Sequence, residues 1–177
     1  MSKVIFFTYL EKFHDALVHF NIESFAGKKV PVKLHMGELK NKFFPKPEFV
    51  KHVIDELKMA NVEPYLFDTT VAYAGLRSSK TDYHKLAKIH GFTMEKIGCG
   101  VIIEDKGIPI TVSNREYEVA GHLVDSTHIF ALSHVKGHVA TGMGGAIKNF
   151  GMGGVTKETK IRMHHGSRPI YQKDACI

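Results

Sequence analysis

Apolar residues along this chain recur at two spacings, one typical of strands and one typical of helices. Short apolar or alternating runs predict strands at residues 3–7, 29–34, 65–67, 101–104, 108–112 and 128–132. Apolar residues three and four positions apart predict helices at residues 9–21, 47–61 and 79–91. Residues 117–125 fit neither spacing clearly, and glycine becomes frequent after residue 136.

Two of the predicted helices carry signals for their ends. Pro47 suits the first turn of a helix, because the N–H that proline lacks would have no partner there. Asn61 and the following Pro64 mark the end of that helix. Ser79 precedes the other helix with the spacing of a capping box, and Gly91 is a natural C-terminal cap.

Strands that alternate with helices predict an α/β fold. We expect a parallel or mixed sheet flanked by helices in a single domain over residues 1–172. Such sheets bind ligands at the carboxyl ends of their strands. Three predicted strands lead directly into polar, chemically active residues, namely His35, Asp68 and His134. We therefore expect these three side chains to line one cleft; the alternative is that they are ordinary polar loop residues.

Composition restricts the class of protein without giving a function. With 177 residues, of which 44% are hydrophobic and 24% charged, the chain has the balance of an ordinary globular protein. This balance excludes intrinsic disorder, a collagen-like repeat and a small disulfide scaffold. The two cysteines, Cys99 and Cys176, indicate a reducing compartment, and we expect a cytoplasmic protein. No apolar stretch reaches the roughly 20 residues of a membrane span, so we expect no membrane partner.

The formal net charge of +6 raises the question of a nucleic-acid partner. The lysines are scattered along the chain, and no basic motif is interleaved with aromatic residues, which argues against nucleic acid. The pattern is typical of a basic, solvated surface, with a small anionic ligand or an acidic protein partner as the alternatives. The absence of tryptophan and the single glutamine, Gln172, resemble the usage of thermophilic proteins.

His134 and His138 lie four residues apart, a spacing that places two imidazoles on one face of a helix. Together with His35 they are the candidate ligands for a transition metal. Gly137 and the preceding strand favour a loop instead, in which both rings would hydrogen-bond the backbone or bind an anion. Because imidazole titrates near neutral pH, His134 and His138 are also the candidate catalytic acid–base groups.

Gly144 and Gly145, followed by Lys148 and Asn149, predict a glycine turn that opens a short helix. Outward-facing amides, the helix N-terminus and the lysine charge would favour a phosphate or carboxylate, for example on a phosphate-bearing cofactor. The spacing is not that of a P-loop, since no Ser or Thr follows the lysine. The alternative is a close-packed turn with Lys148 in solvent.

Asp68, Thr69 and Arg77 complete the predicted cofactor site. They would bring a carboxylate, a hydroxyl and a guanidinium to the same cleft. The planar fork of Arg77 suits a carboxylate or a phosphate, with a surface salt bridge as the alternative. Cys99 could be a reactive thiol, but a buried structural cysteine is the expectation.

Four motifs occur in one order along nearly the whole chain. They are Lys33-Leu34-His35-Met36-Gly37-Glu38, Asp68-Thr69, Gly75-Leu76-Arg77-Ser78, and the stretch from Ser133-His134 through Gly144-Gly145 to Gly153. On these motifs the chain resembles domain-of-unknown-function family 362. Many members of that family continue into a ferredoxin-like module with two four-iron clusters. Residues 173–177, which include Cys176, look like the start of such a module. The resemblance implies an iron–sulfur cluster only in a longer chain, because a cubane cluster needs four thiolates.

A more remote likeness connects the chain with nickel-dependent lactate racemase, in which a lysine that follows a glycine pair anchors the cofactor. Gly144, Gly145 and Lys148 are the positions that match. The Pro-Gly that follows in the racemase stands here as Phe150-Gly151. The likeness favours an anionic cofactor over an anionic polymer.

Three functions stay open at this point. The first is a cofactor- or metal-binding domain that works beside an iron–sulfur electron-transfer unit, either fused to it or as a separate partner. The second is a non-catalytic module that recognises an acidic partner. The third is a racemase-like enzyme acting on a small hydroxy acid. No complete catalytic signature decides between them, so whether the protein is an enzyme also stays open.

Overall fold

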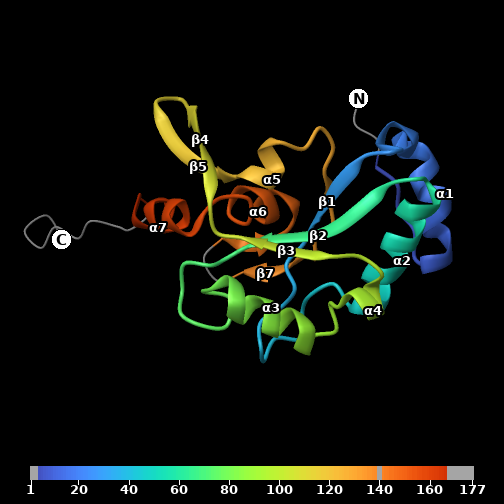
Figure 1. Ribbon diagram of the computed structural model, residues 1–177, viewed down its shortest axis with the longest axis horizontal. Coiled ribbons are helices and arrows are strands. Elements are labelled where there is room, and N and C mark those ends of the chain that lie inside the picture. The colour runs from blue at the N-terminus through green and yellow to red at the C-terminus, as the bar shows by residue number, and fades with distance from the viewer. Residues whose placement is uncertain (1–3, 139–140, 167–177) are drawn as a thin grey trace, which may run out of the picture.

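A computed structural model describes residues 4–138 and 141–166 of the chain (Figure 1). These residues form a parallel four-stranded sheet of order β3-β2-β1-β6. Its strands are β1 (Lys29–Lys33), β2 (Glu63–Thr69), β3 (Val101–Glu104) and β6 (Phe130–Ala131). Helices flank the sheet, which confirms the predicted single-domain α/β fold (Figure 1).

Two antiparallel hairpins and several helices surround this sheet. The hairpins pair β4 (Gly107–Val112) with β5 (Arg115–Ala120), and β7 (Lys136–His138) with β8 (Gly142–Gly144). The α-helices are α1 (Phe13–Leu17), α2 (Pro47–Met59), α3 (Lys80–Ile89), α4 (Met94–Ile97), α5 (Gly121–Val124), α6 (Ala146–Gly151) and α7 (Lys157–Gly166). The 3-10 helices are η1 (Leu10–Lys12), η2 (Val18–Phe20) and η3 (Ile22–Phe25).

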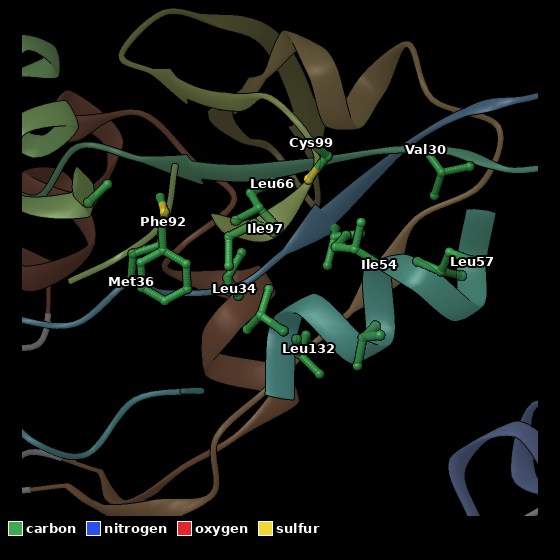
Figure 2. Packing of buried hydrophobic residues seen from close by; sticks show 14 of the residues in the cluster. Val30, Leu34, Met36, Ile54, Leu57, Leu66, Phe92, Ile97, Cys99 and Leu132 are labelled. Carbon is green, nitrogen blue, oxygen red and sulfur yellow. The ribbon is translucent and has the colours of Figure 1, made fainter. Parts of the chain in front are cut away.

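The period-two alternation of the strands divides the buried side chains into two clusters. The larger cluster contains Val30, Val32 and Leu66 from the sheet, packed with Ile54 and other residues of α2 (Figure 2). The smaller cluster lies on the other face and contains Tyr65, Phe67, Ala120 and Leu123. Each fully buried Leu or Ile of this kind contributes about 2–3 kcal/mol to folding. The alternation also places Lys33, which follows Val32, on the face of the smaller cluster.

The predicted helix ends at residues 47 and 79 are confirmed. Pro47 is the first residue of α2, and Asn61 just beyond that helix has a positive φ of 58°. The Ser79 hydroxyl accepts the amide N–H of Asp82 at 3.2 Å, and α3 begins at the next residue. Gly91 follows α3 with a φ of 88°, a conformation that favours glycine.

The predictions for the N-terminal segment are wrong or only partly right. Residues 4–7 form no strand, and residue 3 lies outside the described part of the chain. Val4 and Phe6 are each 89% exposed, because no strand lies beside them to pair with. The helix predicted at 9–21 is split into η1, α1 and η2, and it ends at Asn21, whose φ is 51°.

One further strand prediction needs correction, and the structure resolves the stretch that the sequence left ambiguous. The strand predicted at 128–132 is reduced to β6, because this edge strand pairs with β1 only at Phe130 and Ala131. The side chain of His128 instead packs against Phe25, with ring centroids 4.6 Å apart. The ambiguous stretch 117–125 contains both kinds of element, the end of β5 followed by α5.

The structure describes one of the two cysteines, and its helices can be compared with a membrane span. Cys99 is buried, and burial raises the pKa of its thiol to about 11, so it is a structural rather than a reactive cysteine. Cys176 and the rest of residues 173–177 lie outside the described residues. Among the helices that the structure describes, none combines the length and apolar character needed to cross a membrane.

Candidate functional site

A cavity of about 780 Å³ opens at the carboxyl ends of β1 and β2. The loop after β6, the β7–β8 hairpin, α6 and α7 form the rest of its wall. All the site residues predicted from the sequence line it: His35, Asp68, Thr69, Arg77, His134, His138, Gly144, Gly145, Lys148 and Asn149. The expectation that His35, Asp68 and His134 share one cleft is therefore confirmed, as the rule for open α/β sheets requires.

Asp68 is the centre of a buried hydrogen-bond network at the end of β2. Its Oδ1 accepts Lys33 Nζ at 2.8 Å and the backbone N–H of Thr69 at 2.9 Å. Its Oδ2 accepts Arg77 at 3.0 Å and the hydroxyl of Tyr83. Burial alone raises the pKa of Asp68, but Lys33 and Arg77 outweigh burial and lower the pKa to about 2. The carboxylate is thus ionised and fully partnered.

Lys33 links this network to the glycine-rich part of the chain. Its Nζ donates to Asn149 Oδ1 at 2.8 Å, and Asn149 Nδ2 donates to the Lys33 carbonyl and to the Ser133 hydroxyl. Gly153 packs against Lys33 and Asn149 with no room for a side chain. A Cβ on that residue would lie 2.7 Å from Lys33 Nζ and nearer still to the carbonyl oxygen of Asn149. Asn149 therefore has a positioning role for Lys33, beside any role toward a ligand.

A second carboxylate, Glu38, holds the outer side of Arg77. Glu38 Oε1 accepts Arg77 Nη1 at 2.8 Å and the Tyr73 hydroxyl at 2.5 Å. The guanidinium also lies 4.8 Å from the ring centroid of Tyr83. Arg77 therefore forms a buried ion pair with Asp68 and a part-buried one with Glu38, and the surface salt bridge considered as an alternative is excluded.

Three other lysines line the cavity without such partners. In the described part of the chain, neither Lys136, Lys148 nor Lys160 has a carboxylate within 4.0 Å. Lys136 donates to the Phe43 carbonyl at 3.2 Å, and Lys160 donates to Thr69 and Thr70. Burial lowers the pKa of all three, and the charge of Arg77 lowers each further.

The candidate metal ligands do not form a metal centre. His134 lies in the loop before β7 and His138 ends that strand, so the helical spacing that would place both rings on one face does not occur. His35 Nε2 lies 3.4 Å from Lys136 Nζ, and burial together with nearby cations lowers the pKa of His35 to about 3. Within the described residues, no group of three His, Cys, Asp or Glu side chains is arranged to hold a metal ion.

The surplus of positive charge around this cavity further opposes a divalent cation. The described residues therefore give no support to the metal assignment of His35, His134 and His138, which stays a prediction.

The glycine pair has a different local structure from the predicted turn. Gly144 is the last residue of β8, and only Gly145 directly precedes the short helix α6. Close packing does not explain either glycine, because added Cβ atoms would meet nothing nearer than Lys148 Cδ at 3.7 Å. Since α6 has only six residues, the helix N-terminus is a weak basis for anion binding. Lys148 itself lines the cavity, as the prediction requires.

Sequence reasoning missed several residues of this site. Lys33 could have been suspected, because a lysine directly after alternating Val30 and Val32 falls on a strand position that is buried here. Tyr83 is a buried residue of α3, and its hydroxyl contact with Asp68 has no local signal in the sequence. Lys160 lies in a basic, weakly apolar segment, and nothing in its neighbourhood marks it as buried.

Comparisons with known proteins give one match. Neither the curated proteins nor the solved structures contain a match to this chain. A family model described as "Domain of unknown function (DUF362)" matches residues 30–174, which include every residue lining the cavity. The match extends from β1 through α7 and covers most of the chain. The chain therefore belongs to the DUF362 family of unknown function.

Proposed function

We propose that the protein binds a small molecule carrying a phosphate or carboxylate group in the cavity at the carboxyl ends of β1 and β2. The observation that carries this proposal is the charge of the wall. Among the described residues, five lysine and arginine side chains line the cavity beside two carboxylates, Asp68 and Glu38. Both carboxylates are committed to Lys33 and Arg77. The remaining lysines, Lys136, Lys148 and Lys160, are left for an external anion.

Electrostatics and size both support a small anion. Two unit charges 4 Å apart interact by about 4 kcal/mol at the effective dielectric of a protein surface, so clustered lysines repel one another unless an anion lies between them. Burial is the main cause of the lowered pKa values of Lys136, Lys148 and Lys160, and the positive charge of Arg77 lowers each of them further. A cavity of about 780 Å³ has the size of typical small-molecule sites.

His134 and His138 at the same cavity give it acid–base capacity. Burial lowers the pKa of His134 and His138, so both rings are neutral and can accept a proton near pH 7. This supports a cofactor or substrate site more than a flat surface for an acidic protein. The association with an iron–sulfur electron-transfer partner and the racemase-like activity rest on resemblance alone and stay predictions.

Calorimetric titration with inorganic phosphate and with citrate tests the proposal. We expect saturable binding of at least one of them to the wild-type chain, and weaker binding at high salt. Lys148→Ala should reduce the affinity by about tenfold or more, because a charge-assisted contact is lost. Lys51→Ala is the matched control, since it removes one positive charge from an exposed lysine paired with Asp55 on α2. Equal affinity in both variants, or no saturable binding, would contradict the proposal.

A further inference from the structure

Lys160 is a buried amine at the wall of the cavity. It lies on α7, is only 5% exposed, and packs against the end of β2. Its Nζ donates hydrogen bonds to the Thr69 hydroxyl and to the Thr70 carbonyl. The Thr69 hydroxyl donates its own hydrogen bond to the Gly153 carbonyl at 2.8 Å. Its oxygen can therefore only accept a hydrogen bond from Lys160.

This set of partners suits a neutral amine rather than an ammonium group. A neutral amine has two N–H donors and one lone pair, whereas an ammonium group has three donors. Thr69 and Thr70 accept two hydrogen bonds, and the structure gives no third acceptor among the described residues. In the neutral form the remaining position on the nitrogen is a lone pair, on a residue that lines the cavity.

The charges around Lys160 favour the same neutral form. Burial is the largest effect, and Lys33, Arg77 and Lys148 add unfavourable positive charge. Asp68 is the one group that favours the charged form, and its carboxylate is already bound by Lys33 and Arg77. Together they lower the pKa of Lys160 to about 7. A large share of this lysine is thus an uncharged amine at neutral pH.

We propose that Lys160 is a nucleophile that forms an imine with the carbonyl group of an anionic ligand in this cavity, namely a small 2-oxo acid or a phosphate-bearing aldehyde. This inference rests on the proposed anion site, because Lys136 and Lys148 would hold the carboxylate or phosphate of the ligand. A buried, uncharged lysine without a carboxylate partner is the usual form of an imine-forming amine.

The chemical step is balanced without any further reagent. The lone pair of Nζ attacks the carbonyl carbon, and the electron pair of the C=O bond moves to oxygen to give a carbinolamine. The carbinolamine then loses its oxygen together with the two amine protons as one water molecule, which leaves a C=N bond. No group is oxidised or reduced. His134 and His138 line the same cavity and can relay these protons.

Borohydride trapping tests this proposal. The wild-type chain is incubated with pyruvate and reduced with sodium borohydride, and the adduct is located by peptide mass spectrometry. We expect one dominant adduct, at Lys160. In Lys160→Arg the amount of dominant adduct should fall by about tenfold or more, because a guanidinium does not form the imine. In Lys157→Arg, on the same helix, it should be unchanged. A dominant adduct elsewhere, or adducts spread over surface lysines, would overturn the proposal.

Two further measurements use the wild-type chain and do not depend on the folding of a variant. The trapping rate at Lys160 should rise with pH and level off above about pH 7, where the amine is already neutral. A rate that keeps rising toward pH 10 indicates an ordinary lysine and contradicts the assignment. Acetone, which has the carbonyl but no anion, should label Lys160 at least about tenfold more slowly than pyruvate. Equal labelling would contradict the proposed ligand class.

A phosphate-binding measurement distinguishes a failure of the imine proposal from a failure of the anion site on which it rests. Saturable phosphate binding without trapping at Lys160 would disprove the imine and leave the anion site in place. Absence of phosphate and pyruvate binding would contradict both proposals. Lys160→Arg places a permanent positive charge at this position, so its phosphate affinity should not fall by more than about threefold if the variant folds. Lys160→Met serves as the second variant, since it fills a similar volume without charge.

Discussion

Both halves of the cavity wall contain lysine or arginine side chains, but in the described chain only one half pairs them with carboxylates. On one half, Lys33 and Arg77 are buried and bound to Asp68 and Glu38 at 2.8–3.0 Å. On the other half, Lys136, Lys148 and Lys160 line the same cavity with no carboxylate within ion-pair distance in the described chain. The charges of the first half are balanced by ion pairs, whereas the second half has a surplus of positive charge.

On the proposed function, the position of the carboxylates, rather than the number of cations, separates the charges that stabilise the fold from those that would bind the ligand. Asp68 accepts four hydrogen bonds, so replacing it should disturb the fold. Among the described residues Lys148 has no carboxylate partner, so on the proposed function its replacement should disturb ligand binding and little else. The following predictions test that contrast.

The largest effect is expected for Asp68→Asn. The substitution leaves Lys33 buried without its counter-charge and leaves Arg77 with Glu38 alone, and removing one partner of a buried pair costs about 3–5 kcal/mol. Urea unfolding measures this loss of stability. Asp55→Asn is the control, because Asp55 pairs with Lys51 on the exposed face of α2 and should cost less than about 1 kcal/mol. Similar losses in both variants would show that the Asp68 network is not a structural centre.

The pH dependence of stability should reveal the same carboxylate. The pKa of Asp68 is about 2 in the folded protein, below the value of about 3.9 in an unfolded chain. A lowered carboxylate pKa stabilises the fold above the unfolded value, and this contribution is lost as the pH falls from about 4 to 2. The shift corresponds to about 2–3 kcal/mol. Urea unfolding at several acidic pH values should show this loss in Asp55→Asn, whereas Asp68→Asn should lack that part of it.

Tyr83→Phe should lower the stability of the fold by less than Asp68→Asn does. The Tyr83 hydroxyl donates to Asp68 and accepts the backbone N–H of Met36 at 3.2 Å, and the side chain is fully buried. Removing the hydroxyl leaves both partners short of one hydrogen bond, which costs about 1–3 kcal/mol. Thermal unfolding measures the change, and phosphate affinity should stay near the wild-type value. A loss of affinity with unchanged stability would place Tyr83 in the ligand site instead.

The smallest change in stability is expected for Lys148→Ala. Lys148 has no ion pair within the described residues and lies at the half-exposed rim, so unfolding should change by less than about 1 kcal/mol. Phosphate affinity should nevertheless fall by about tenfold. This variant therefore gives the opposite result to Tyr83→Phe. A large loss of stability with intact binding would reverse the assignment of the two halves of the wall.

Local signals in the sequence were enough to predict where helices α2 and α3 begin and end. Pro47, Ser79 and Gly91 act through their own backbone or through a neighbour three residues away, so the bounds of α2 and α3 could be predicted. The grouping of His35, Asp68 and His134 also followed from the sequence, because parallel strands deliver their carboxyl ends to one edge of a sheet. Residues 4–7 show the limit, since an apolar run becomes a strand only where another strand pairs with it.

Only the tertiary structure decided which charges are paired and which are left for a ligand. Lys33 meets Asn149 across 116 positions of the chain, and Lys160 meets Thr69 across 91. Such contacts depend on how β1, β2 and α7 pack, and no spacing in the sequence encodes them. The four-residue interval between His134 and His138 fails for the same reason, because it indicates a shared face only on a helix and the chain forms a loop and a strand there. The sequence by itself determined the fold class and the edge of the sheet where chemistry gathers, while burial and packing decided the state of each charge.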